Sequence, residues 1–277
     1  MRAEGTGGQE CLASVRIGSV RYLNSLPLIA GLEGVRLEHP SELARALQAA
    51  EVDVALVPVY EVMRAPAGTY QLVDGVGIGS RGAVYSVFVA HEVPLEEVEF
   101  VVADPASLTS VHLLQVLFHL RGRRGVKMLA PGSSCAVPSR ELPGRGGRLW
   151  IGNQAIELRL SRGLPEALRF WDLGEAWTQC TGLPFVYAVW AMRKDSLSGR
   201  AREVAEAFRV VGRNGLSLRD QIAQRDGGFG EAFARRYLHD HICYELGEDQ
   251  KRGLELFRGE LKKAGLLSGE PVVFDWI

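Results

Sequence analysis

Apolar and polar residues alternate in blocks over the first 60 positions. An apolar run that starts at Val15 breaks into a polar stretch at 19–25. Apolar residues at helical spacing over 41–50, with Ser41 as N-cap, predict a helix, and the continuous apolar run at 52–58 predicts a buried strand. Strands that alternate with helices in this way are typical of a mainly parallel α/β sheet.

The same pattern returns farther along the chain. An apolar strand at 100–103 precedes a helix with an apolar face over 111–120, and from residue 200 onward apolar residues recur at helical spacing. Two strand-like segments, 83–90 and 184–192, lie where one α/β unit meets the next. This order predicts two lobes, with the chain crossing from the first to the second at one of these strands and returning at the other. The cleft between such lobes can close on a small ligand.

This layout divides the chain into two α/β lobes, each a mixed sheet flanked by helices. We expect residues 15–90 plus 191–277 to form lobe 1 and residues 91–190 to form lobe 2. The Gly-rich, polar residues 1–14 are expected to be a disordered tail. The two crossing strands would act as hinges between the lobes.

Residues 77–82, Gly-Ile-Gly-Ser-Arg-Gly, match the G-x-G-x-x-G pattern of dinucleotide-binding loops. That loop follows a strand and opens a helix. Here the strand-like segment 83–90 follows instead. We therefore expect a glycine bend that lets backbone approach backbone or ligand, and no nucleotide site.

Composition excludes several classes of function. The net charge of −1 over 277 residues gives no field for nucleic acid or a membrane surface. The chain has no apolar stretch of signal-peptide or membrane-span length, so a cytoplasmic protein is expected. The four cysteines are far apart, and His239 and His241 lack a third ligand, so we expect neither a metal nor another cofactor. Oligomeric state cannot be predicted from the sequence.

Polar side chains gather where predicted strands end, which is where α/β sheets bind ligands. Arg21 can offer a fork of donors, Asn24 a side-chain amide, and the helix that begins near Pro27 its free N–H groups. The full set of candidate residues is Arg21, Asn24, Ser25, Ser86, Ser107, Thr109, Ser110, Gly152 and Asn153.

Several of these residues have a plain structural alternative. Ser25 and the hydroxyls of 107–110 could simply cap helices, and Arg21 could be a solvated surface charge. None of the six histidines lies in these loops. Such a pocket suits a carboxylate but has no obvious acid or base, which fits a binding protein or an enzyme that uses little acid/base chemistry of its own.

Two stretches resemble the chorismate dehydratase family of the futalosine route to menaquinone. They are Tyr-Leu-Asn-x-Leu-Pro-Leu at 22–28 and the segment at 172–190, which reads Asp-Leu-Gly, then Trp177, then Thr-Gly-Leu-Pro-Phe-Val-Tyr-Ala-Val-Trp. The resemblance covers nearly the whole chain after residue 14. It implies a fold like that of type II periplasmic binding proteins and the dehydration of chorismate to 3-[(1-carboxyvinyl)oxy]benzoate.

The resemblance also implies roles for individual residues. Asn24 would be the key catalytic contact near the reacting carbons, and Ser86 with the 107–110 loop would hold carboxylate oxygens. Gly152 and Asn153 would line the wall of the second lobe, whereas Arg21 is a weaker candidate. Since asparagine is a poor base, we expect the enolpyruvyl carboxylate of the substrate to take the proton.

Two alternatives stay open at this point. One is 1,4-dihydroxy-6-naphthoate synthase of the same pathway and fold, which would be expected to place a histidine in the cleft. The other is a non-catalytic protein that binds a small carboxylate.

Overall fold

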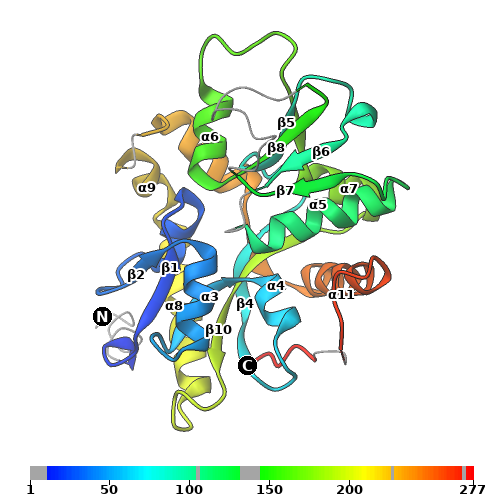
Figure 1. Ribbon diagram of the computed structural model, residues 1–277. Coiled ribbons are helices and arrows are strands. Elements are labelled where there is room, and N and C mark those ends of the chain that lie inside the picture. Colours follow the sequence, from blue (N-terminus) through cyan, green and yellow to red (C-terminus); the bar gives the residue numbers. More distant parts are fainter. Residues whose placement is uncertain (1–10, 104–106, 132–143, 226–227, 270–272) are drawn as a thin grey trace.

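The computed structural model describes residues 11–103, 107–131, 144–225, 228–269 and 273–277. These residues form two sheets, one above the other in Figure 1, with helices packed around both. In this part of the chain, no helix is long and apolar enough to cross a membrane.

The first sheet has six strands in the order β11-β4-β10-β3-β1-β2. Its central strand, β10 (Phe185–Arg193), runs antiparallel to both of its neighbours, β3 (Val54–Pro58) and β4 (Tyr70–Ser80). The others are β1 (Ile17–Val20), β2 (Arg36–Glu38) and β11 (Cys243–Leu246). The sheet is therefore mixed: β1 pairs parallel with β2 and with β3, and Leu72 of β4 forms an isolated parallel bridge with Trp276.

The second sheet has five strands in the order β7-β6-β8-β5-β9. They are β5 (Val87–His91), β6 (Phe100–Val102), β7 (Lys127–Leu129), β8 (Gly146–Ile151) and β9 (Arg169–Asp172). The strand β5 is buried along its whole length, and β8 and β9 pair antiparallel with it on its two sides. The predicted two-lobe α/β architecture is confirmed by these two mixed sheets.

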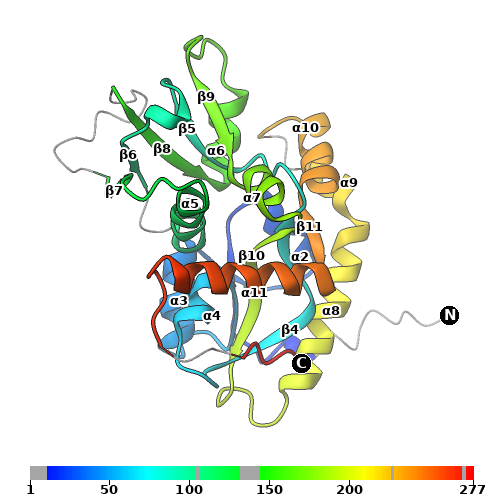
Figure 2. The same cartoon turned by 90° about the vertical axis from the view of Figure 1, so that its right-hand side faces the viewer.

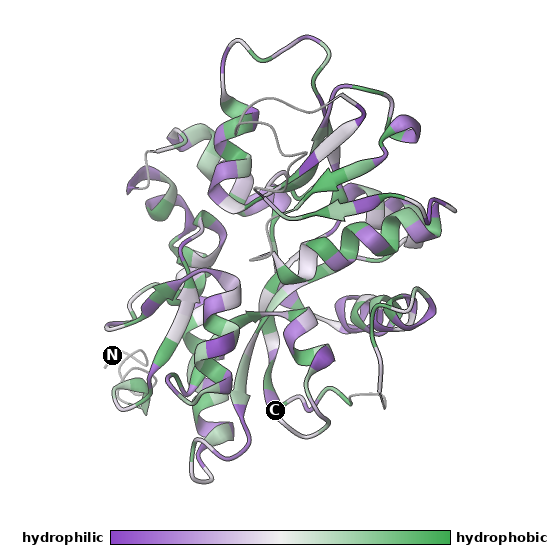
Figure 3. Cartoon of the chain, viewed as in Figure 1, coloured by the Kyte–Doolittle hydropathy of each residue, from purple (hydrophilic) through white to green (hydrophobic). Residues whose placement is uncertain are grey.

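The helices pack around both sheets (Figure 1 and Figure 2). They are α2 (Leu26–Ile29), α3 (Pro40–Gln48), α4 (Val59–Arg64), α5 (Leu108–Leu120), α6 (Gly152–Leu160), α7 (Leu173–Thr181), α8 (Ala201–Ser217), α9 (Arg219–Arg225), α10 (Glu231–Arg236) and α11 (Glu248–Lys263). Figure 2 shows α11 running across the molecule beside β10, and it contacts α5 as well. Figure 3 shows mainly hydrophobic strands between helices of mixed character.

Each of the two strands predicted to cross between the lobes pairs within a single sheet. β5 belongs to the second sheet and β10 to the first, so the chain passes between the sheets at 81–86 and again at 182–184. We propose that the lobes divide in these two segments, a few residues before the expected boundaries at 90 and 190. Of the residues expected in the tail, 11–14 pack against the fold: Leu12 is buried and the Arg200 guanidinium donates to the Cys11 carbonyl. Residues 1–10 lie outside the described part of the chain.

Two local expectations are corrected. The helix predicted with Ser41 as its N-cap starts two residues earlier, with His39 as N-cap and Pro40, whose ring suits this position, as the first helical residue. Of the glycines at 77–82, Gly82 lies in a bend with a φ of +87°, as expected, whereas Gly77 and Gly79 lie inside β4. A Cβ atom on Gly77 would lie 2.8 Å from the Ala188 carbonyl oxygen, and one on Gly79 2.7 Å from the Phe185 carbonyl oxygen. These glycines therefore let β4 lie close against β10.

Candidate active site

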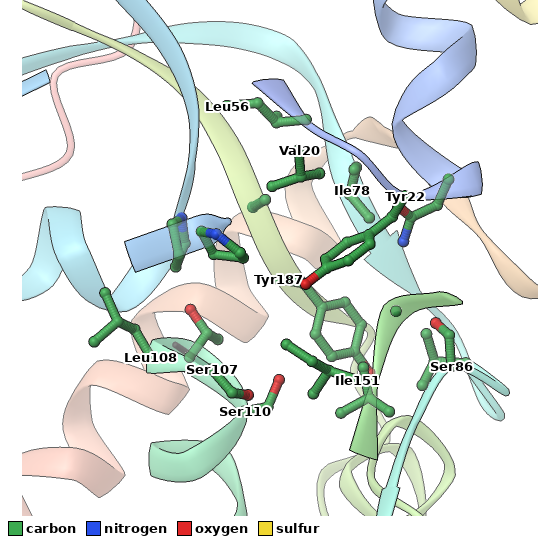
Figure 4. Close-up of a pocket in the computed structure, with 18 residues that line it drawn as sticks. Val20, Tyr22, Leu56, Ile78, Ser86, Ser107, Leu108, Ser110, Ile151 and Tyr187 are labelled. Carbon is green, nitrogen blue, oxygen red and sulfur yellow. The ribbon is translucent and has the colours of Figure 1, made fainter. Parts of the chain in front are cut away.

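A pocket lies between the two lobes, at the carboxyl ends of β1 and β3 and beside the first chain crossing (Figure 4). Its empty volume is about 580 Å³, which includes space open to solvent. The lining residues are Val20, Tyr22, Asn24, Pro40, Leu56, Pro58, Ile78, Val84, Ser86, Val87, Ser107, Leu108, Thr109, Ser110, Ile151, Gly152, Tyr187 and Ala188. A mostly apolar lining with a few polar groups is typical of a small-molecule site.

The polar groups of the pocket are neutral. Asparagine, serine, threonine and tyrosine supply them, and no aspartate, glutamate, lysine, arginine or histidine is among the described lining residues. Figure 4 shows Ser107 and Ser110 on the first turn of α5 at one side of the pocket and Ser86 at the other. A ligand held here would be bound by hydroxyl and amide groups.

Two buried oxygens in the pocket have no hydrogen-bond partner among the described residues. They are Asn24 Oδ1 and Ser107 Oγ, and both residues are less than a tenth exposed. A buried polar atom without a partner costs free energy, so the pair points to a ligand or water in the pocket. Ser107 precedes α5 yet its side chain makes no capping bond, which argues against the capping alternative for this residue.

Ser86 lies on the chain crossing and is held from two directions. Its side-chain oxygen accepts a 2.8 Å hydrogen bond from the Tyr237 hydroxyl, and its carbonyl accepts one of 2.9 Å from the Gly152 N–H. Burial raises the pKa of Tyr237 well above its ordinary value, outweighing the lowering effect of Ser86 and Asn24 beside it. The phenol therefore remains a hydrogen-bond donor.

Gly152 begins α6 at the edge of the pocket with a φ of +62°, in the left-handed region. A Cβ atom there would come within 2.6 Å of the Tyr22 ring. Only glycine combines this backbone conformation with such close contact to the aromatic ring. Gly152 and Tyr22 thus bring the two lobes together directly over the pocket.

Thr109 and Ser110 also line the pocket, as predicted for binding residues. Thr109 Oγ1 accepts a 3.3 Å hydrogen bond from the Tyr60 N–H of the first lobe. The ring of Tyr60 stacks on His112 one turn farther along α5, with centroids 3.4 Å apart. The start of α5 is therefore attached to α4 across the lobe boundary.

Three of the predicted binding residues lie outside the pocket lining. Arg21 is exposed and donates through Nε to the Leu37 carbonyl at 2.9 Å. Ser25 Oγ is buried and donates to the carbonyls of Val20 and Tyr22. Both side chains hold the loop in shape. Ser25 precedes α2 but makes no side-chain capping bond there, and Arg21 is tied to β2, so neither contact is the one that the structural alternative expected.

Asn153 is the third predicted residue outside the pocket lining. Its Oδ1 accepts a 2.9 Å hydrogen bond from the Leu23 N–H, next to Asn24. Asn153 belongs to α6 of the second lobe and Leu23 to the first, so this contact joins the lobes. The residue supports the pocket wall from behind.

Sequence reasoning missed two tyrosines of the pocket. Tyr22 was read only as part of a polar stretch, and Tyr187 as part of an apolar strand. The Tyr187 hydroxyl is 3.3 Å from Ser80 Oγ, and burial raises the pKa of this phenol well above its usual range. Simple alternation along β10 would not have located Tyr187, because the pairing of β10 with β4 is irregular between Val186 and Ala188.

The chain crossing at 81–86 is held by Asp172, which is almost fully buried. Its carboxylate accepts hydrogen bonds from the Val84 and Tyr85 N–H groups at 3.0 and 2.8 Å, and it caps α7 through Gly174 and Glu175. The Arg159 guanidinium adds a contact at 3.3 Å. Val84 and Ser86 both line the pocket, so Asp172 fixes part of its wall.

Two mixed α/β sheets with a pocket between them define a two-lobe protein of the periplasmic-binding-protein type. Solved structures support the fold. A protein from Archaeoglobus fulgidus has a TM-score of 0.68 at 17% identity, covering 91% of this chain and 98% of that one. A Candida albicans protein, described as having the generic periplasmic binding protein fold, has a TM-score of 0.55 at 13% identity, with 92% and 91% covered.

Sequence comparison identifies the family. Residues 15–263 match the menaquinone biosynthesis family. The chorismate dehydratase of Thermus thermophilus is 31% identical over 266 residues, which cover 87% of this chain and 93% of that protein. The chain belongs to the menaquinone biosynthesis family, and the resemblance noted in the sequence is confirmed.

Proposed function

We propose that this protein dehydrates chorismate to 3-[(1-carboxyvinyl)oxy]benzoate in the futalosine route to menaquinone. Its family and the name of its Thermus thermophilus relative support this assignment. The observation that carries it within the site is the pair of buried, unpartnered oxygens, Asn24 Oδ1 and Ser107 Oγ, on opposite lobes of one pocket.

The reaction suits a pocket of neutral groups. Chorismate loses the proton from C3 and hydroxide from C4, which leave as one water, and the ring becomes aromatic. Because aromatic stabilisation drives the reaction forward, the protein has mainly to hold two carboxylates and stabilise the anion that develops. The hydroxyls of Ser86, Ser107 and Ser110 are donors for this purpose, together with the N–H groups at the start of α5.

The base in this proposal comes from the substrate. The described lining residues include no group that titrates near neutral pH. The enolpyruvyl side chain of chorismate is joined to C3 through an ether oxygen. Its carboxylate can therefore reach the C3 proton within the same molecule. Asn24 would hold the reacting part of the substrate in position for this step.

The alternative of 1,4-dihydroxy-6-naphthoate synthase predicts a histidine in the cleft. The lining residues described here contain none, and His112 contacts Tyr60 and the Leu108 carbonyl instead. The structure thus favours the dehydratase over this alternative. An assay for release of water from chorismate distinguishes the dehydratase from a non-catalytic protein that binds a carboxylate.

The deciding experiment is incubation of the purified protein with chorismate and no added cofactor. We expect a product lighter by one water, detected by mass spectrometry and by the absorbance of an aromatic ring. Asn24→Ala is expected to lower turnover by roughly 10²-fold, as for removal of a preorganised polar contact. Asn214→Ala, on the exposed face of α8, is the control and should leave turnover unchanged.

Tight binding of chorismate without water loss would contradict the proposal and favour a binding protein. Full turnover by Asn24→Ala would leave the dehydratase in place but remove the role of Asn24.

A further inference from the structure

We propose that Tyr237 is a positioning residue that directs the Ser86 hydroxyl into the pocket from behind it. This inference rests on the proposed function, because it assigns Ser86 a hydrogen bond to the substrate. Tyr237 is absent from the pocket lining and is only 1% exposed, so it would act through Ser86 and not by touching substrate.

The hydrogen bond between the two side chains has a defined direction. The Tyr237 hydroxyl donates to Ser86 Oγ at 2.8 Å. The Ser86 oxygen is then an acceptor on the Tyr237 side, so its own proton must point elsewhere. Because Ser86 lines the pocket, a substrate oxygen is the acceptor within reach of that proton.

Accepting a hydrogen bond also makes Ser86 a stronger donor, since bonds in a chain polarise one another. Burial raises the pKa of Tyr237 above its ordinary value, which keeps the phenol protonated and the direction of the chain unchanged. The Asn24 side chain also lies beside this phenol. One buried hydroxyl thus lies behind two residues of the proposed site.

The Tyr237 ring is itself held in place by aromatic neighbours. It lies in a single π-helical turn, Tyr237–His241, and stacks on Phe233 with centroids 5.8 Å apart. At the other end of that turn, His241 Nδ1 lies 2.9 Å from the Ala83 carbonyl oxygen in the chain crossing. Turns of this kind are frequent at functional sites, and here the turn connects the C-terminal helices to the chain crossing at 81–86.

The test is a double-mutant cycle with chorismate as substrate. Tyr237→Phe removes only the hydroxyl and is expected to lower kcat/KM about tenfold, mainly through kcat. In a Ser86→Ala background, Tyr237→Phe should lower kcat/KM by less than about threefold. This residual loss would reflect the effect of Tyr237 on Asn24.

Tyr244→Phe is the matched control. Its hydroxyl is also buried, and it has no hydrogen-bond partner among the described residues. We expect this variant to keep wild-type kcat/KM. Equal activity of Tyr237→Phe and Tyr244→Phe would overturn the proposal, and so would a tenfold loss that persists in the Ser86→Ala background.

A failure of the proposed function is recognised separately, because then the wild-type protein itself releases no water from chorismate. In that case crystal structures decide the inference. We expect the Ser86 side chain to change rotamer in Tyr237→Phe and to keep it in Tyr244→Phe. An unchanged Ser86 rotamer in Tyr237→Phe would contradict the proposal.

Discussion

At the scale of single residues, hydrogen-bond partners separate the groups that face a ligand from those that hold the loop. Ser25 and Asn24 are neighbours in the sequence. Ser25 Oγ donates to two backbone carbonyls, whereas Asn24 Oδ1 has no partner among the described residues. The same contrast separates Ser107 from Thr109, whose Oγ1 already accepts from Tyr60.

Gly152 provides a test of the close contact over the pocket. Gly152→Ala is expected to destabilise the protein by about 3 kcal/mol, the sum of left-handed strain and overlap with Tyr22. It should also lower turnover by up to about 10²-fold, because the displaced Tyr22 ring lines the pocket. Thermal unfolding and the chorismate assay measure the two effects.

Gly163→Ala is the control for strain alone. Its φ is +71° and nothing lies within 4 Å of the added carbon, so we expect a loss of about 1 kcal/mol and normal turnover. If the two variants unfolded at the same temperature, the overlap of the added methyl group with the Tyr22 ring would have no measurable cost in stability.

The sequence showed which residue types could bind an anion better than it showed where their side chains point. Arg21 was the natural anchor for an anion by chemistry, but its guanidinium lies against β2, at the Leu37 carbonyl and Glu38. Which strand lies next to β1 depends on long-range pairing that local pattern does not contain. Tyr187 was missed for the opposite reason, because an apolar strand hides one polar group whose direction only the sheet determines.

At the scale of elements, the segment at 172–190 has two structural roles. Asp172 caps α7 and holds the chain crossing, and the rings of Trp177 and Phe185 pack at 5.3 Å in the core. The segment therefore shapes the pocket through Asp172 and also lines it directly with Tyr187 and Ala188. The apolar strands β3, β6 and β10 and the long helices α5 and α8 were predicted from periodicity. The strand β4 was not predicted, and its glycines and the start of α3 depend on contacts with other segments.

Asp172→Asn tests the hold on the chain crossing. Asparagine can still cap α7, but Arg159 loses its buried counter-ion. The amide NH₂ group of the asparagine would also face the backbone N–H groups that donate to Asp172, such as that of Tyr85. We expect a loss of about 3 kcal/mol in unfolding free energy and a lower kcat/KM, because Val84 and Ser86 would shift. Denaturant unfolding with the chorismate assay measures both.

The comparison is with Asp195→Asn, whose carboxylate is 68% exposed and pairs with Arg193. Solvent screens a surface pair of this kind, so we expect little change in unfolding free energy. Equal losses in the two variants would show that the bonds to Val84 and Tyr85 do not stabilise the fold.

At the scale of the whole molecule, the two lobes meet through a few specific contacts. Asn153 accepts from Leu23, Thr109 accepts from Tyr60, and Gly152 packs on Tyr22. All three lie around the pocket, so the contacts that join the lobes also close the site. Two-lobe proteins commonly open and close about such a boundary.

Asn153→Ala is expected to weaken closure without touching the substrate. The lost hydrogen bond corresponds to about 1 kcal/mol, so we expect KM for chorismate to rise about fivefold with little change in kcat. Gln154→Ala, the exposed neighbour on α6, should keep the wild-type KM. A fall in kcat at unchanged KM would instead indicate that Asn153 acts in the chemical step.

The central position of β10 also determines when the molecule can be completed during synthesis on the ribosome. Its partners, β3 and β4, emerge first and cannot finish their sheet until β10 has been made. The second sheet, built from the continuous stretch between them, can fold in that interval. Since Tyr187 and Ala188 of β10 line the pocket, the binding site cannot form before β10 has been made. Until then the edges of β3 and β4 are unpaired, and this is the period in which the nascent chain is most exposed to aggregation.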